Sequence, residues 1–331
     1  MLWTEKYRPG GLADIVGQEP VIRRLVSFSE SGTVPHLILS GPHGTGKSVA
    51  VECFAKELFR ENWELNTSIF QTADLFLQGK SFLEQEERYA HLYQKSQSLL
   101  TNFKYITKWY SSLRPLDTEF KLMVFEDAHT LTREAQQALR RIMERSSRTC
   151  RFIFTTTNQS ALIPAITSRC LPLFFAPVDQ GVILPYLSEI REKEQTVVRA
   201  CTGDDLELIA PAAQGDMRRA ILLLQVAMET GMCKDLFSAD ESETRNVATA
   251  ALAALKEGDA RLAIRRLESL MIDYGLSGSE VLAEIRTIIR REYNDPALAV
   301  VLSDAEFRMR HCNNEFIQLG AFATETRGVF L

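Results

Sequence analysis

The sequence predicts an α/β fold, in which a parallel sheet with helices on both faces is followed by two all-helical parts. Up to about residue 176, short apolar runs typical of buried strands alternate with amphipathic segments, as in a parallel sheet wrapped by helices. From Asp179 onward, apolar residues recur at helical spacing only. At 331 residues the chain is also too long for one core. We therefore expect three domains: residues 1–176 (α/β), 177–237 (helical) and 238–331 (helical).

The stretch Gly41–Ser48 has the spacing G-x-x-x-x-G-K-[S/T] of a phosphate-binding loop. His36–Leu39 before it predicts a buried strand and Ser48–Leu58 after it an amphipathic helix, a context that an ordinary glycine-rich turn lacks. Backbone N–H groups of such a loop and the positive end of the helix dipole face an anionic phosphate. Lys47 is expected at the β- and γ-phosphates of a nucleotide, and the Ser48 hydroxyl at Mg²⁺. The predicted nucleotide-binding residues of the loop are Gly41, Pro42, His43, Gly44, Thr45, Gly46, Lys47 and Ser48.

Two acids follow an apolar run at Lys121–Asp127, which predicts a strand that ends in carboxylates. In nucleotide hydrolysis the first such acid orders Mg²⁺ and the second polarises the attacking water. We therefore expect Glu126 to be a Mg²⁺ ligand and Asp127 to act on the water, although acidic strand ends also arise by chance. A further predicted strand, Cys150–Thr157, ends at Asn158, whose amide is placed to orient the same water.

A basic helix is predicted after Thr132, which is expected to cap it, and it runs to about Ser146. Arg141, Arg145 and Arg148 form one row by helical spacing, and Arg133, Arg140 and Arg151 add to the density of positive charge. The sequence leaves two interpretations open: a solvated basic face, or contact with phosphates or with a neighbouring subunit.

The rest of the chain contains an N-terminal arm, further strands and helices, and one expected linker. Residues 3–18 form a polar arm, which either covers a nucleotide base or packs on the domain. The remaining expected elements are a helix at Glu19–Ser31, strands at Trp63–Thr67 and Leu171–Phe175, one or two helices within residues 68–118 that include Phe82 and Tyr89, a helix capped by Asp216, a polar linker at Ser238–Glu243, and helices at Ala248–Leu255, Arg261–Met271, Val281–Tyr293, Ala297–Met309 and Glu315–Thr324.

Composition narrows the class of protein. The net charge of −5 argues against a surface coated for nucleic-acid binding, so any such contact needs a local basic face. The six cysteines lie far apart without a C-x-x-C pair, which predicts neither a zinc site nor a disulfide framework. The polar start of the chain and the absence of a long apolar run predict no membrane segment and a cytoplasmic, intracellular location.

Seven stretches follow one another along the chain: Glu5-Lys-Tyr-Arg-Pro9, Ile15-Val-Gly-Gln18, the phosphate loop, Ala135-Gln-Gln-Ala-Leu-Arg-Arg141, Ser168-Arg-Cys170, Gly215-Asp-Met-Arg-Arg-Ala220 and Glu315-Phe-Ile-Gln-Leu319. In these motifs and in their order, the whole chain resembles replication factor C small subunits, clamp-loader members of the AAA+ ATPases. Ser168-Arg-Cys170 is the most specific of the motifs. The chain is similar to a divergent second small subunit of the archaeal type.

The resemblance implies an AAA+ domain at residues 1–176, a helical lid at 177–237 and a helical collar at 238–331. It implies a hetero-pentamer with other replication factor C subunits that uses ATP and Mg²⁺ to open a sliding clamp and place it on primer–template DNA. A prokaryotic protein of this kind would lie near the nucleoid. The roles implied for individual residues are adenine contact for Tyr7, Arg8 and Val16, nucleotide sensing for Asn158 and, from the lid, Arg218, and action in trans on the neighbour's site for Arg169.

Two departures from the family pattern bear on function. The family carries Asp-Glu-Ala-Asp at the acidic strand end, whereas this chain has Glu126-Asp127-Ala128-His129. Misplacement of a catalytic group by about 1 Å can cost about 10²-fold in rate, so we expect ATP binding with slow hydrolysis at this site. Residues 67–118 lack the family's Ser-Asp-x-Arg-Gly stretch, so its DNA contact is not carried over. The alternatives are a mainly structural, weakly hydrolysing subunit that donates Arg169, or a different AAA+ machine.

Overall fold

The computed structural model describes residues 1–79, 81, 83, 90–115, 118–194, 203–230, 233–293 and 295–330. It divides into two compact units, Met1–Gly231 and Met232–Leu331. Phe82 and Tyr89, expected to belong to a helix, lie outside the described residues. The division into domains at residues 176 and 237 stays a prediction.

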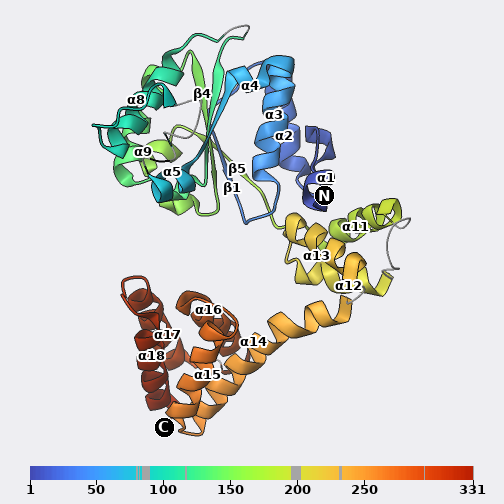
Figure 1. Ribbon diagram of the computed structural model, residues 1–331, viewed down its shortest axis with the longest axis vertical. Helices are drawn as coiled ribbons and strands as arrows, with labels where there is room; N and C mark the ends of the chain where they lie inside the picture. The colour runs from blue at the N-terminus through green and yellow to red at the C-terminus, as the bar shows by residue number, and fades with distance from the viewer. Residues whose placement is uncertain are drawn as a thin grey trace. The chain divides into compact units, whose positions relative to one another are not determined.

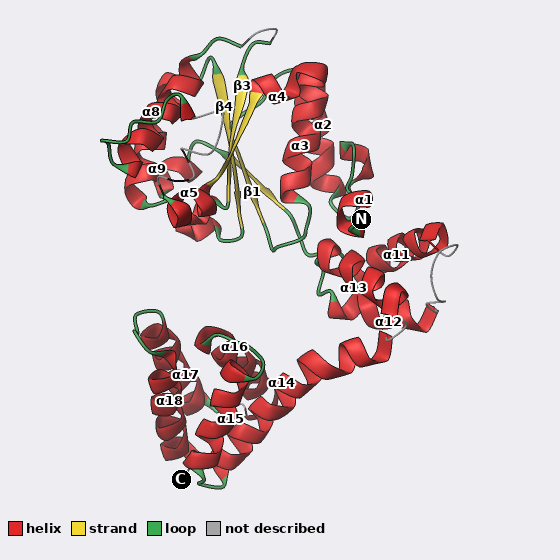
Figure 2. Cartoon of the chain, in the orientation of Figure 1, coloured by secondary structure: helices red, strands yellow, loops and turns green. Residues whose placement is uncertain are grey.

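The first unit is built on a five-stranded parallel sheet with the strand order β2-β3-β4-β1-β5 (Figure 2). Parallel strands place their carboxyl ends at one edge, where ligands of open α/β sheets bind. Both β1, which leads into the phosphate loop, and β3, which ends in the acids, therefore open on the same edge. The strands are β1 (Leu37–Ser40), β2 (Thr67–Gln71), β3 (Lys121–Glu126), β4 (Cys150–Thr156) and β5 (Leu171–Phe174).

The predicted strand Trp63–Thr67 is wrong. Residues Trp63–Asn66 form the short helix α4, and β2 begins only at Thr67, where pairing with Leu122 of β3 starts. The alternation of Trp63 and Leu65 suggested a strand, but Leu65 is exposed and contributes nothing to a sheet face. The strand is instead defined by its pairing with β3, which sequence spacing does not reveal.

Helices cover both faces of the sheet, with α5, α8 and α9 on one side and α2 and α3 on the other (Figure 1). Successive residues of β3 serve the two cores: Met123 and Phe125 pack towards α8 and α9, whereas Leu122 and Val124 pack towards α2 and α3. Strands buried on both faces explain why the sequence showed continuous apolar runs. The helices are α2 (Glu19–Ser31), α3 (Lys47–Phe59), α5 (Thr72–Gln78), α8 (Leu99–Ser112), α9 (Arg133–Arg145) and the short α10 (Pro164–Thr167).

Several local predictions are confirmed. Thr132 caps α9, because its side chain accepts a hydrogen bond from the backbone N–H of Ala135. Asp216 caps α13 in the same way, accepting from the N–H of Arg219 at 2.9 Å. The helices after the sheet are α11 (Gln180–Glu194), α12 (Gly203–Ala212) and α13 (Met217–Thr230). The arm, expected only as a polar segment, contains a short helix, α1 (Trp3–Lys6), whose buried Trp3 donates its backbone N–H to Gln225 of α13.

The second unit has helices and connecting turns, and no strand, among its described residues. The polar stretch Ser238–Glu243 is not a linker, because it lies inside the long helix α14. Polar, acidic residues suit an exposed helix surface as well as a linker, so composition did not separate the two. The helices are α14 (Cys233–Lys256), α15 (Ala260–Ile272), α16 (Gly278–Ile288), a π-helical turn (Ile289–Tyr293), α17 (Pro296–Met309) and α18 (Glu315–Phe330). Within the described part of the chain, none of the helices combines the length and apolar character needed to cross a membrane.

Candidate nucleotide-binding site

A cavity of 520 Å³ lies beside the phosphate loop in the first unit. This volume is within the usual range for small-molecule sites, about 300–1,000 Å³. Four parts of the chain form most of its wall: the arm, the phosphate loop with the first half of α3, the carboxyl ends of β2, β3 and β4, and the helices α11 and α13. The polar and charged residues among those lining it are Thr4, Glu5, Tyr7, Arg8, His43, Thr45, Lys47, Ser48, Glu52, Gln71, Glu126, Asp127, Thr155, Tyr186 and Arg218.

The phosphate loop ends at Gly46, and α3 begins at Lys47. Two backbone carbonyls of the loop, those of Gly41 and Pro42, accept hydrogen bonds from Lys47 Nζ at 2.8 and 2.5 Å. Burial lowers the pKa of Lys47, and the nearby carboxylates of Asp127 and Asp216 oppose that shift. A half-buried ammonium group at the start of a helix is suited to an anionic ligand.

Gly44 is the point where the helix α13 meets the phosphate loop. Its backbone has φ of 64°, and a Cβ built on it would lie 1.6 Å from Oδ1 of Asp216. Its carbonyl accepts a hydrogen bond from the backbone N–H of Met217 at 3.1 Å. Only glycine allows this approach, so the loop and the first turn of α13 are in direct contact.

The two acids at the end of β3, Glu126 and Asp127, differ in backbone conformation. Glu126 is the last strand residue and accepts a hydrogen bond from Gln71 Nε2, whereas Asp127 has φ of 51°, in the left-handed region. The buried Thr72 hydroxyl lies within hydrogen-bond distance of the backbone carbonyl oxygens of Glu126 and Asp127, at 2.5 and 2.8 Å. Sequence reasoning missed Gln71 and Thr72, although a polar pair at the end of a neighbouring strand was a usable signal.

The other catalytic candidates lie outside the described lining of this cavity, with one exception. The Asn158 side chain accepts hydrogen bonds from the backbone N–H and the hydroxyl of Ser160, and so caps a short 3₁₀ turn. Arg169 is paired with Glu144 of α9 at 2.6 Å and donates to the carbonyl of Ala165. Arg218 is the exception, because it lines the cavity.

The three residues expected to contact adenine line the cavity together: Tyr7, Arg8 and Val16. Arg8 is held by Glu52 of α3 at 2.5 Å. The Tyr7 hydroxyl donates to Glu194, at the end of α11. Burial, together with this hydrogen bond to a carboxylate, raises the pKa of Tyr7 to about 12, so its hydroxyl remains a donor.

A second hollow, of 580 Å³, lies between α8 and α9 and is strongly basic. We call it the basic groove; its charged lining residues are Lys104, Lys108, Arg133, Glu134, Arg140 and Arg141. Of the predicted row of arginines, only Arg141 belongs to its described lining. The lysines of α8 were not predicted to lie beside the basic helix, because the sequence of residues 68–118 does not show which of its residues pack against that helix.

Comparison with known proteins places the chain in a family. It is 33% identical over 97% of its length to the replication factor C small subunit of Archaeoglobus fulgidus, of which it covers 95%. The chain belongs to the replication factor C small subunit family. The corresponding protein of Picrophilus torridus is 32% identical, with 93% of this chain and 91% of the relative covered. The family described as DNA polymerase III, delta subunit, matches residues 17–179.

Solved structures agree on the fold. Two variants of Thermotoga maritima RuvB match with TM-scores of 0.53 and 0.54 at 16% and 14% identity, each with 89% of this chain and 91% of the other covered. At this identity the likeness concerns the fold alone. The predicted α/β AAA+ fold with helical parts after it is confirmed.

Proposed function

We propose that this protein is an ATP-binding subunit of a replication factor C clamp loader. In that complex, ATP binding and hydrolysis open a sliding clamp and load it onto primer–template DNA. The observation that supports this most strongly is family membership over nearly the whole chain, with 97% of this chain aligned. The cavity adds support, because a phosphate loop, a half-buried lysine and two acids surround it.

In this proposal, ATP is the substrate and lies along the cavity from the arm to the acids. Tyr7, Arg8 and Val16 contact the base, and the loop amides with Lys47 bind the phosphates. Arg218 reaches the γ-phosphate from α13. Ser48 and Glu126 suit Mg²⁺, which prefers oxygen ligands and, when bound, neutralises charge that develops on the transferred phosphoryl group.

Hydrolysis at this subunit's own site is proposed to be slow. With Glu at the strand end and Asp after it, the Mg²⁺ ligand is one methylene longer and the acid that polarises water one methylene shorter than in the family pattern. Asp127 is in addition fixed through its carbonyl, which accepts from Thr72 and Thr130. Because the backbone of Asp127 is constrained, it has little freedom to move the shorter side chain closer to the attacking water.

Site-specific hydrolysis in the reconstituted complex tests this proposal. Lys47→Ala should abolish nucleotide binding by this subunit. Asp127→Asn should change total turnover little, whereas the double substitution Glu126→Asp, Asp127→Glu, which restores the family order of the two acids, should raise it. A complex that loses the turnover of this site on Asp127→Asn would contradict slow hydrolysis without touching the proposal of ATP binding.

Arg169 is proposed to act in trans as an arginine finger at the neighbouring subunit's site, and the basic groove to contact DNA phosphates. Arg169 is partly exposed and lies outside the described lining of its own subunit's cavity, as an in-trans role requires. The groove supplies the local basic face that an overall acidic protein needs for a polyanion.

The second candidate is a mainly structural subunit that binds ATP and donates Arg169. The exchanged acids favour it, whereas Lys47 and Arg218 in the cavity favour retained activity. A different AAA+ machine is the third candidate, since the chain is also similar in fold to Thermotoga maritima RuvB. Pull-down of a sliding clamp by the assembled complex separates a clamp loader from the third candidate.

A further inference from the structure

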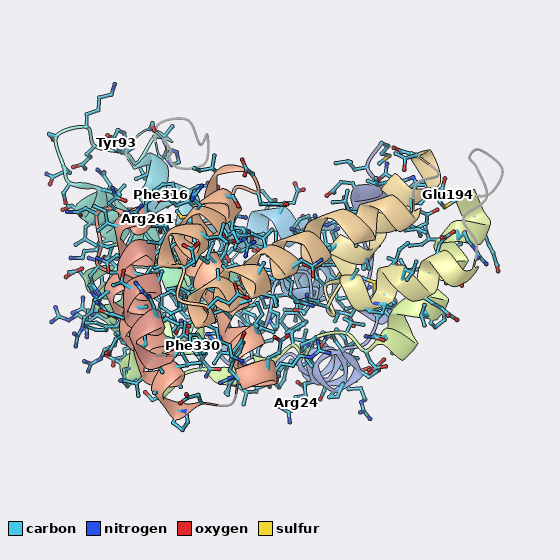
Figure 3. The ribbon with its side chains drawn as sticks, turned by 90° about the horizontal axis from the view of Figure 1, so that it is seen from below. Arg24, Tyr93, Glu194, Arg261, Phe316 and Phe330 are labelled. Atoms are coloured by element: carbon cyan, nitrogen blue, oxygen red, sulfur yellow. The ribbon has the colours of Figure 1, made fainter. Side chains whose placement is uncertain are left out.

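A carboxylate outside the predicted site joins the arm to the lid. Glu194 ends α11 (Figure 3), and its side chain is only 9% exposed. It forms an ion pair with Lys6 Nζ and accepts a hydrogen bond from the Tyr7 hydroxyl at 2.5 Å. Both partners come from consecutive residues of the arm. A carboxylate this far from water requires such partners, so the arm and the end of α11 stabilise each other.

The next two residues of the arm hold the opposite wall of the cavity. Arg8 pairs with Glu52 of α3 at 2.5 Å, and the carbonyl of Pro9 accepts from Cys53 Sγ of the same helix at 3.5 Å. The arm therefore spans from α11 to the helix that begins at the phosphate loop. Its backbone is fixed between these ends as well, because the carbonyl of Tyr7 accepts from the Tyr186 hydroxyl of α11 at 3.3 Å.

This arrangement makes one wall out of segments that are far apart in sequence. Tyr7 and Arg8 line the cavity, and so do Tyr186 of α11 and Arg218 of α13. A nucleotide bound in this cavity would lie against both the arm and α13, so an arm that is held in place adds to the contacts that retain it. Glu194 holds the arm at α11, and Glu52 holds it at α3.

We propose that Glu194 is a positioning residue for nucleotide retention: it fastens the arm to α11 and so slows release of the bound nucleotide. The inference rests on the proposed nucleotide binding and adds a residue that touches neither phosphate loop nor acids. Loss of a hydrogen bond to a charged group weakens an interaction by roughly tenfold or more. The nucleotide dissociation rate is therefore expected to rise roughly tenfold when the pairing is removed.

Stopped-flow release of a fluorescent ATP analogue from the full-length chain tests this inference. Glu194→Gln should raise the dissociation rate, whereas Glu189→Gln should leave it unchanged. Glu189 is a matched control, because it lies on the same helix and pairs only with Lys193, one turn away, among the contacts described for it. Thermal unfolding without nucleotide, followed by circular dichroism, reports on stability separately from release.

A double-mutant cycle identifies the contact itself. Tyr7→Phe removes one hydroxyl, and its effect combined with Glu194→Gln should be smaller than the sum of the two, because both break the same link. Equal release rates for Glu194→Gln and Glu189→Gln overturn the inference. Should Glu194→Gln fail to fold, Lys6→Met decides, because Lys6 pairs with Glu194 and is absent from the described lining of the cavity: an unchanged release rate overturns the inference and a raised rate supports it. Wild-type protein that binds no analogue would instead refute the proposed function.

Discussion

The contact between Gly44 and the start of α13 gives a sharp prediction for the substitution Gly44→Ala. The new methyl group would lie 1.6 Å from Oδ1 of Asp216, so the Asp216 carboxylate must turn away from the loop. That movement removes the cap that Asp216 provides, worth about 1 kcal/mol.

The loss of about 1 kcal/mol corresponds to roughly a fivefold weaker association of α13 with the loop. We expect ATP affinity to fall by about this factor, because Arg218 moves with the same helix turn. Hydrogen exchange at the amides of Met217 and Arg219 should accelerate to a similar extent in the nucleotide-free protein. Fluorescence titration with an ATP analogue and exchange measured by mass spectrometry or NMR provide the two readouts.

Gly32→Ala is the matched control. Gly32 has the same φ of 64° at the end of α2, but among the described residues no atom lies within 4 Å of a Cβ built there. Both substitutions therefore carry backbone strain of about 1–2 kcal/mol, and only Gly44→Ala adds the clash. The reasoning is refuted if the two variants show the same nucleotide affinity and the same exchange at Met217.

Three further predictions concern other parts of the first unit. Arg169→Ala should leave ATP binding by this subunit unchanged but lower hydrolysis at the neighbour's site by about 10³-fold or more, measured in the assembled complex; loss of binding by the subunit itself would contradict action in trans. Lys108→Ala in the basic groove should weaken DNA binding and reduce the slope of log K against log salt by about 1, whereas Arg145→Ala, outside the described groove lining, should not. Burial, and secondarily the nearby Arg151, lowers the pKa of His36 from 6.5 to about 4. Between these two pH values only the unfolded state binds the proton, so the free energy of unfolding should fall by roughly 2–3 kcal/mol as pH decreases from about 6.5 to 4. A His36→Gln variant with the same dependence of unfolding free energy on pH would contradict this.

Features set by neighbours in the sequence were predictable. The phosphate loop, the capping residues Thr132 and Asp216 and the alternation of strands and helices depend on spacing within about ten residues, and the sequence shows that spacing directly. The apolar run before Glu126 likewise showed where β3 ends, since burial on both faces of a sheet requires continuous apolar residues.

Features set by contacts between distant segments were not predictable. Gln71 meets Glu126 only because β2 and β3 pair in register, and Glu194 meets Tyr7 across 187 positions of the chain. The start of β2 at Thr67 and the passage of α14 through Ser238–Glu243 were misjudged for the same reason. Local composition fits more than one structure at such positions. The sequence by itself predicted a nucleotide site and the loop that forms it, whereas only the tertiary structure decided which distant side chains surround the cavity beside that loop, because pairing and burial join residues that spacing leaves unrelated.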